Sequence, residues 1–375
     1  MITDARRQSL ALGVGVAAAA ACAGGAVVWG ATAFFSAYLV AFLFWTEIAF
    51  GCLGLTMLHA LTSGGWGKAA RRPLSAGGAT LPFVALSFVP VALGVRALFP
   101  WARPEVVAGD LVLEHKALYL NVPFFVARAV GYFALWSALA LFFYRSTLRR
   151  GPDRGPSRRA RTFAGPGLVA CGVTMSFAAI DWVMSLEPHW FSTMVGALVV
   201  VGALLSAMAF AIVVVTSDAK EHECPTQALH DLGNLLLVFT MLWAYLAFSQ
   251  YLLIYAGNIA EEVPFFVYRT EGGWQHVSLA LIVLHFAVPF FVLLSRRTKR
   301  NPERLRAVAV FVLLMRLVEL FWFVAPNFKG TALAVGPLDL LAPIAVGGVW
   351  FYAFVRRVRA LDAATPAPAS RSEAP

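Results

Sequence analysis

Long runs of apolar residues, separated by short polar segments, form the main pattern along this chain. A helix that crosses a bilayer needs about 20 predominantly apolar residues. Runs of that length predict ten transmembrane helices, at roughly residues 8–30, 32–62, 76–98, 118–144, 161–184, 190–216, 230–256, 275–296, 305–325 and 336–357. We therefore expect an all-α polytopic membrane protein whose helices pack as bundles.

The composition agrees with this class. Of the 375 residues, 60% are hydrophobic and only 13% are charged, a balance that excludes an ordinary soluble domain. The connections are too short for a folded domain outside the membrane. Residues 1–362 are expected to form a single integral membrane domain. The tail, residues 363–375, is rich in Ala, Pro and Ser and is expected to be disordered.

The basic residues alternate strongly between the two sides of the predicted membrane. The positive-inside rule places the connections that are rich in Lys and Arg, and with them both termini, on the cytoplasmic side of a bacterial inner (plasma) membrane. The other side holds only a few of the 30 Lys and Arg residues, namely Arg96, Arg103, Lys116, Arg269 and Lys329. This bias explains the net charge of +10 without a nucleic-acid partner, and attraction to anionic lipid is an expected side effect.

The first predicted span resembles a signal peptide, because basic residues precede an alanine-rich run. We expect a retained helix instead, since the small residues Gly13, Ala17, Ala21 and Gly24 have the spacing that suits close helix packing.

The chain offers no ligand spacing for a redox centre. Its four cysteines are scattered, and no two histidines are placed as axial ligands on facing helices. We therefore expect no haem, iron–sulfur cluster or metal ion in this chain. A quinone or quinol is the one small-molecule ligand that the sequence suggests.

Several ionisable residues fall near the middle of predicted spans: Glu47, Arg128, His285, Arg316 and Glu319. Such groups are costly in lipid, so each should face the bundle interior and find a partner. Arg316 and Glu319 are three residues apart and can pair on one helix face. Arg128 has no acidic neighbour on its own helix and needs a partner from another helix.

Two interpretations of these residues stay open. They form a path for protons, with His230 and Asp231 at its cytoplasmic mouth, or they are buried ion pairs that fix the positions of the helices. A pair between Glu47 and Arg128 would favour the structural role, whereas an unpaired Glu47 would favour proton transfer.

The run DWVMSLEPHWFST, residues 181–193, places polar and aromatic residues at one predicted boundary between membrane and water. Aromatic residues with a few polar groups suit a quinone headgroup, whose tail stays in lipid. The candidates for such a pocket are Asp181, Trp182, His189, Trp190, Gln250 and Tyr255. The alternative is an aromatic belt with ordinary helix-end residues, which needs no ligand.

The same run carries a resemblance to a known family. Residues 181–194, DWVMSLEPHWFSTM, resemble the signature of the NrfD/polysulfide-reductase-like membrane subunits. The match is strengthened by FSQYLLIYAGNIAEEVPFF (residues 248–266), GGWQHVSLALIVLHFAVPFFVLLSRRTKRNP (residues 272–302) and ELFWFVAPNF (residues 319–328). The longer form of the run is specifically similar to one of the two NrfD-like subunits of bacterial alternative complex III, and the chain looks like the second of them.

The resemblance implies a membrane subunit of a quinol:cytochrome c oxidoreductase in a respiratory electron-transport chain. Such a subunit is not catalytic alone and works with periplasmic Fe–S and haem c proteins and a second NrfD-like subunit. It would contribute a quinone pocket, a path for proton translocation, or a scaffold. The alternatives outside this reading are a stand-alone secondary transporter, which also buries charges, and a purely structural assembly subunit.

Overall fold

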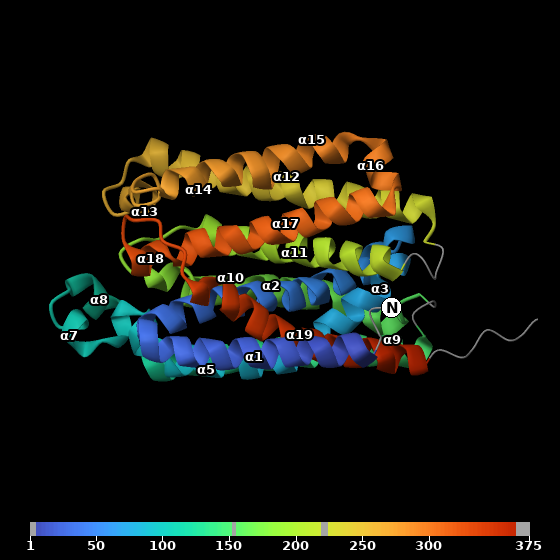
Figure 1. Ribbon diagram of the computed structural model, residues 1–375, viewed down its shortest axis with the longest axis horizontal. Helices are drawn as coiled ribbons and strands as arrows, with labels where there is room; N and C mark the ends of the chain where they lie inside the picture. The colour runs from blue at the N-terminus through green and yellow to red at the C-terminus, as the bar shows by residue number, and fades with distance from the viewer. Residues whose placement is uncertain (1–4, 152–154, 219–223, 365–375) are drawn as a thin grey trace, which may run out of the picture.

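Helices account for nearly all regular structure in the computed structural model, which describes residues 5–151, 155–218 and 224–364. Ten helical stretches are long and apolar enough to cross a membrane, so the expected all-α polytopic membrane fold is confirmed. They lie side by side along the long axis of the molecule (Figure 1). Residues 365–375 of the expected tail lie outside the described residues.

Eight of these stretches contain one long α-helix each. They are α1 (Ala5–Trp29), α2 (Ala31–Thr62), α9 (Val122–Arg150), α10 (Arg158–Trp182), α11 (Met194–Asp218), α12 (Thr226–Gly257), α17 (Pro302–Val324) and α19 (Pro337–Ala363). The start of α1 and the end of α19 lie at the same end of the bundle, which we call the terminal face (Figure 1). We call the other end the cap face.

The remaining two stretches are divided. The third consists of α3 (Gly65–Gly78), α4 (Leu81–Ser87) and α5 (Val89–Leu93). The eighth consists of α14 (Trp274–Ala280), the π-helical segment η3 (Leu281–Ala287) and α15 (Val288–Leu294). Short helices join the stretches: α6 (Val95–Leu98), η1 (Pro100–Ala102), α7 (Pro104–Val107), α8 (Leu111–Lys116), η2 (Met184–Leu186), α13 (Val263–Val267), α16 (Arg296–Arg300) and α18 (Pro326–Lys329).

The expected start of the third span, residue 76, is wrong. The helix begins at Gly65, because its first half is amphipathic and therefore hidden from a search for apolar runs. The basic residues of this half are typical of a loop, yet Arg71 is buried and Arg72 donates to Asp362 of α19 at 2.5 Å. The span is then interrupted twice within its apolar part, after Gly78 and after Ser87.

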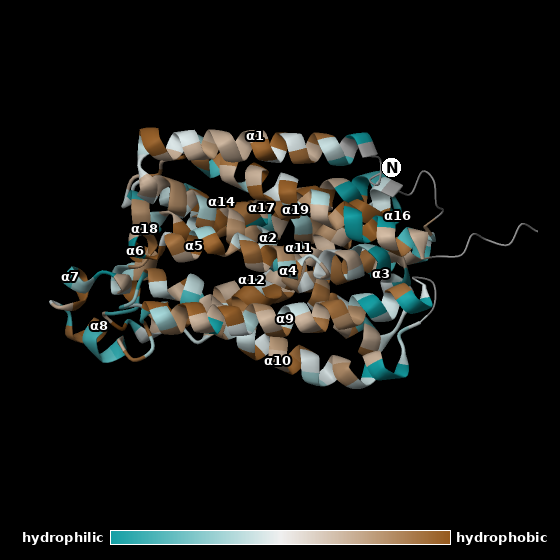
Figure 2. Ribbon diagram, turned by 90° about the horizontal axis from the view of Figure 1, so that it is seen from below, coloured by the Kyte–Doolittle hydropathy of each residue, from teal (hydrophilic) through white to brown (hydrophobic). Residues whose placement is uncertain are grey.

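The centre of the bundle is formed by α2 and α11. In their most apolar windows, 89% and 78% of the residues are buried, against 22% in α1 and in the eighth stretch. Helices that are apolar on all sides suit such a position, whereas peripheral helices expose their apolar side chains to lipid. Figure 2 shows hydrophobic residues along the middle of the helices and hydrophilic residues mainly towards the two ends.

Small residues of α1 do pack closely against the bundle, but they lie on a different face from that of Gly13 and Gly24, which the spacing predicts. A Cβ at Gly13 or Gly24 would meet no heavy atom within 4 Å, so these residues face outward. The contact is made by Gly15, where an added Cβ would lie 2.9 Å from Gly348 of α19. The sequence could not decide which face of α1 meets the bundle, because both faces carry small residues at helical spacing.

Candidate functional site

Four ionisable side chains meet in the middle of the bundle, and we call Glu47, His285, Arg316 and Glu319 the central cluster. They come from α2, η3 and α17, and each is at most 2% exposed. Arg316 donates through Nη2 to Glu47 Oε2 at 2.7 Å and through Nη1 to Glu319 Oε2. Arg316 and Glu319 do pair on one helix, as their spacing allows, and Glu47 joins them across the bundle. Glu47 is thus paired with a cation, although Arg316 takes the place of Arg128, and such a pair is the arrangement expected for a structural role.

His285 completes the cluster from the π-helical segment. Its Nε2 lies 3.5 Å from Glu319 Oε2, and its ring meets the Trp243 ring edge-on with centroids 4.1 Å apart. The Trp243 indole N–H donates to the other oxygen, Glu319 Oε1, at 2.8 Å. π-Helical turns in long helices are often found at functional sites, and here the turn carries the one histidine of the cluster.

The charges of the central cluster do not balance without a bound proton. Arg316 supplies one positive charge, whereas Glu47 and Glu319 supply two negative charges when both are ionised. An unbalanced charge is very costly in a buried, apolar setting. One further proton restores neutrality, and three groups are able to hold it: either carboxylate or the imidazole of His285.

Several polar atoms around the cluster have no hydrogen-bond partner within the described part of the chain. They are Glu47 Oε1, both ring nitrogens of His285, Arg316 Nε, and the hydroxyl oxygens of Thr46 and Ser206. Buried polar groups are normally satisfied, so such a concentration at one place calls for an explanation. It leaves donors and acceptors available beside the pairs that hold the cluster together.

Gly202 of α11 provides the space in which the Arg316 guanidinium lies. A Cβ built at this position would be 2.1 Å from Nη2 and 2.5 Å from Cζ of Arg316. We predict that Gly202→Ala displaces the guanidinium and destabilises the protein by about 1–3 kcal/mol, the usual cost of overpacking. The measurement is the thermal unfolding midpoint in detergent. Gly13→Ala is the control, because its Cβ meets open space, and equal midpoints for both variants would contradict the prediction.

A second buried ion pair lies nearer the cap face, between α9 and α10. Arg128 donates to both carboxylate oxygens of Asp181, through Nε at 2.9 Å and Nη2 at 2.8 Å. The Tyr132 hydroxyl donates to the same carboxylate at 2.9 Å, and the guanidinium lies 3.8 Å from the centroid of the Tyr119 ring. Arg128 thus finds its partner on another helix as expected, and that partner is Asp181 rather than Glu47.

Asp181 is fully buried, and three donors from α9 occupy its oxygens. Trp182, beside it, is also buried and packs parallel to Phe133 with ring centroids 5.6 Å apart. These contacts are those of a tightly packed pair of helices. Neither side chain presents a free polar group to a ligand, apart from the Trp182 indole nitrogen, which has no hydrogen-bond partner in the described structure.

A third buried pair joins Glu187 to Arg269, a residue that the sequence suggested was only one more loop charge. Arg269 is 0% exposed and donates to Glu187 Oε1 at 2.8 Å. It also donates to the main-chain carbonyls of Phe265, at 2.7 Å, and Phe323, at 2.9 Å. One signal was available: it is a lone arginine in an otherwise acidic and aromatic connection. Its binding of main-chain carbonyls follows from the fold alone.

Trp190 belongs to this third group. Its ring stacks on Phe265 with centroids 3.9 Å apart, and Phe265 in turn lies 3.7 Å below the Arg269 guanidinium. His189, one residue earlier, is half exposed and bonds through Nε2 to Asp110 Oδ2 at 2.6 Å, in the loop before α8. Desolvation acts to raise the pKa of Asp110, but the Leu113 and Val112 N–H groups and His189 hold it below its ordinary value.

The two remaining candidates belong to α12, where the Tyr251 ring meets Phe266, the neighbour of Phe265, with centroids 5.3 Å apart. Gln250 is buried, and its Oε1 has no partner among the described residues. Tyr255 is exposed and stacks on Tyr251 with centroids 5.9 Å apart. Of the residues considered for a quinone pocket, Asp181 and Trp182 therefore pack against α9, whereas Trp190 and Tyr255 are linked through the rings of Phe265, Phe266 and Tyr251.

His230 and Asp231 lie at the terminal face with Lys299 of α16. Asn234 connects His230 to Lys299. Its Nδ2 bonds to His230 Nδ1 at 3.2 Å, and its Oδ1 accepts from Lys299 Nζ at 2.7 Å. Desolvation, followed by repulsion from Arg296, lowers the pKa of Lys299. Along α12, His230 and Trp243 are about 20 Å apart at about 1.5 Å per residue, so this group is distant from the central cluster.

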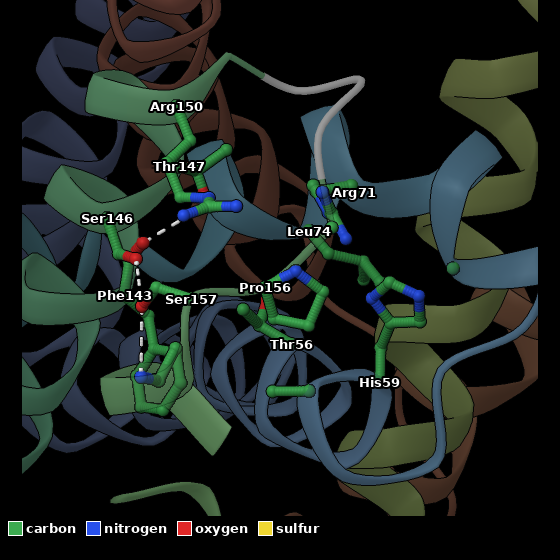
Figure 3. A pocket seen from close by; sticks show the side chains of 14 residues that line it. Thr56, His59, Arg71, Leu74, Phe143, Ser146, Thr147, Arg150, Pro156 and Ser157 are labelled. Atoms are coloured by element: carbon green, nitrogen blue, oxygen red, sulfur yellow. Dashed lines mark hydrogen bonds between the residues drawn. The ribbon is translucent and has the colours of Figure 1, made fainter. Parts of the chain in front are cut away.

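Two cavities lie near the terminal face, and neither is lined by the candidates above. Figure 3 shows the first, of about 30 Å³, where side chains of α2, α3 and α9 such as His59, Arg71 and Ser146 surround a space for about one water molecule. The second is a groove of about 540 Å³ beside α1 and α19.

In comparisons with known proteins, no protein-family model matches the chain and no curated protein matches its sequence.

Proposed function

We propose that this chain is an NrfD-like integral membrane subunit of a quinol:cytochrome c oxidoreductase, and that its central cluster holds and passes a proton inside the membrane. The first part is supported by the sequence resemblance of residues 181–194 and the three further segments. The second part is supported by one observation, the buried group of two carboxylates, one guanidinium and one imidazole that needs an extra proton for neutrality.

The cluster has the chemistry of a proton-holding site because its acceptors differ in their surroundings. Glu319 has both oxygens engaged, whereas Glu47 keeps Oε1 without a partner in the described structure. His285 Nε2 lies 3.5 Å from Glu319 Oε2, and Nδ1 on the other side of the ring has no partner in the described structure. A proton that moves between Glu47, Glu319 and His285 leaves the net charge of the cluster unchanged, and Arg316 keeps at least one ionised carboxylate as a partner.

A series of polar contacts lies between the level of the cluster and the cap face. Trp322, one turn from Glu319 on α17, donates to Ser278 Oγ at 2.8 Å, and Ser278 donates to the Arg269 carbonyl at 2.8 Å. Arg269 then reaches Glu187, whose side chain is 19% exposed. We propose this direction for proton exchange with the outside. The terminal face, with His230 and Asp231, is the proposed cytoplasmic side, in keeping with its arginines.

We propose a structural role for Asp181 and Trp182, because side chains of α9 bind the Asp181 carboxylate and pack against the Trp182 ring. Three of the six quinone candidates, Trp182, Trp190 and Gln250, have a buried polar atom without a partner among the described residues, and only in Gln250 is that atom an acceptor. Any contact of this chain with quinol is therefore proposed for the cap-side end of α12 and not for the Asp181 pair.

Glutamine substitutions test the proton-holding role. In the assembled oxidoreductase reconstituted in vesicles, Glu47→Gln and Glu319→Gln are each expected to lower the protons moved per electron at least twofold, with a smaller effect on electron transfer. Proton release and cytochrome c reduction are measured in parallel. Glu303→Gln, which removes an exposed carboxylate at the start of α17, is the control. Unchanged proton stoichiometry in both glutamate variants would leave the cluster as a set of structural ion pairs.

A secondary transporter remains a second candidate, and the divided third span favours it. Transporters build their sites from helices that are interrupted within the membrane, and this span is interrupted after Gly78 and after Ser87. Purification separates the two functions. A transporter is isolated alone and moves a solute across vesicles, whereas the proposed subunit co-purifies with Fe–S and haem c polypeptides.

A further inference from the structure

The groove beside α19 differs from the cavity in Figure 3 in both size and lining. It has a volume of about 540 Å³, within the range of small-molecule sites. Its wall is mostly apolar and is formed by α1, α4 and α19. The lining residues are Leu12, Phe83, Val349, Tyr352, Ala353, Arg356, Arg357 and Ala360.

One face of α19 runs along the whole groove. Val349, Ala353, Arg356 and Ala360 follow one another at three- or four-residue spacing, so their side chains share that face. At about 1.5 Å per residue, the face from Val349 to Ala360 is about 16 Å long. That length is close to half of the roughly 30 Å hydrocarbon core of a bilayer, which is the depth of a single leaflet.

The apolar part of the groove lies towards the middle of the membrane-spanning helices, and the charged part lies at the terminal face. Leu12 is next to Gly13 on α1, near the Gly15–Gly348 contact in the middle of α19. Phe83 belongs to α4, beyond the first interruption of the third span. Arg356 and Arg357 lie near the end of α19 at the terminal face. Leu12, Phe83 and Val349 are partly exposed, so the groove is open to its surroundings.

The two arginines carry charge that no carboxylate within the described ranges balances. Arg356 is exposed, and no acidic group of those residues lies within ion-pair distance of it or of Arg357. Arg357 lies over the Tyr144 ring, 5.5 Å from its centroid, which leaves its guanidinium without an anionic partner. The nearby carboxylate of Asp362 is engaged by Arg72 at 2.5 Å.

From this arrangement we propose that the groove binds one anionic phospholipid of the leaflet at the terminal face, with an acyl chain along α19 and the phosphate on Arg356 and Arg357. Guanidinium groups bind phosphate oxygens with two parallel hydrogen bonds, which makes arginine well suited to this headgroup. The site is independent of the central cluster and of any role in electron transfer.

The test uses the full-length protein, purified in mild detergent and stripped of lipid. Dioleoyl-phosphatidylglycerol and dioleoyl-phosphatidylcholine have the same chains and differ in headgroup charge, and their binding is compared by native mass spectrometry. We expect the wild-type protein to retain the anionic dioleoyl-phosphatidylglycerol in preference to dioleoyl-phosphatidylcholine. Arg356→Gln/Arg357→Gln should weaken its binding about 30-fold, since each basic residue at a membrane surface contributes roughly a factor of five.

Two matched variants complete the experiment. Arg296→Gln/Arg297→Gln removes the same charge from exposed positions on α16 and should leave binding within about twofold of wild type. Ala353→Trp keeps both groove arginines and fills the apolar wall, so it should abolish retention of the lipid. Equal binding of the two lipids, an equal loss in the α16 pair, or undiminished binding by Ala353→Trp would overturn the proposal.

Discussion

Arg316→Gln is expected to destabilise the folded protein by about 3–5 kcal/mol, the usual cost of removing one partner from a buried ion pair. Arg316 is the single cation between Glu47 and Glu319, and all three are buried. Its loss leaves two carboxylates close together in the middle of the bundle. Part of the cost will be relieved by protonation of one carboxylate, so the destabilisation should be smaller at low pH.

The free energy of unfolding in detergent, measured at pH 5 and pH 8, checks this expectation. Arg304→Gln is the control, because it removes the same charge from an exposed position of the same helix. Adding Glu47→Gln to Arg316→Gln should recover part of the loss, since one of the two stranded carboxylates is then neutral. A similar loss in the Arg304 variant, or no recovery in the double variant, would show that Arg316 does not act through its charge.

Asp181→Asn is expected to cost about 3 kcal/mol of stability through the same mechanism on the cap side. The substitution keeps the shape of the side chain but removes the charge that both Arg128 donors and the Tyr132 hydroxyl require. Arg128, with its guanidinium against Tyr119, would then be a nearly buried cation without a counter-ion. The expected signature is a lower unfolding midpoint, with quinol-dependent turnover reduced only in proportion to the folded protein.

The matched control is Asp231→Asn, whose carboxylate accepts from Gln227 at 2.9 Å in an exposed position. It should leave the midpoint within about 1 °C of wild type, as surface substitutions usually do. The opposite pattern, a normal midpoint with lost turnover in Asp181→Asn, would mean that Asp181 serves the reaction and not the packing of α9 on α10.

The sequence was a good guide to the fold because the membrane imposes one strong rule. Every span needs a long apolar run, and nine of the ten predicted runs coincide closely with helices. The exception is the third span, where α3 faces the bundle with one side and the surface with the other. Its Lys68, Arg71 and Arg72 suggested a loop, because a local pattern cannot show that a charged side chain has a partner on a distant helix.

The same limit explains the site. The pairing of Arg316 with Glu319 was predictable because both lie on one helix, three residues apart. The partners of Glu47 and Arg128 depend on which helices are neighbours, and sequence spacing carries no information on that. Arg269 was missed for a related reason, since most of its hydrogen bonds are to main-chain carbonyls.

The π-helical segment has a consequence for how this site can arise or be lost. A π-helical turn accommodates about one residue more than an α-helical turn, and each residue of an α-helix turns the chain by about 100°. A gene that lacked one codon within residues 281–287 would encode a regular helix in that place. His285 would then point to a different neighbour, while most contacts of α14 and α15 could persist. Insertion or deletion of a single residue is thus a simple route between relatives that have this imidazole in the cluster and relatives that do not.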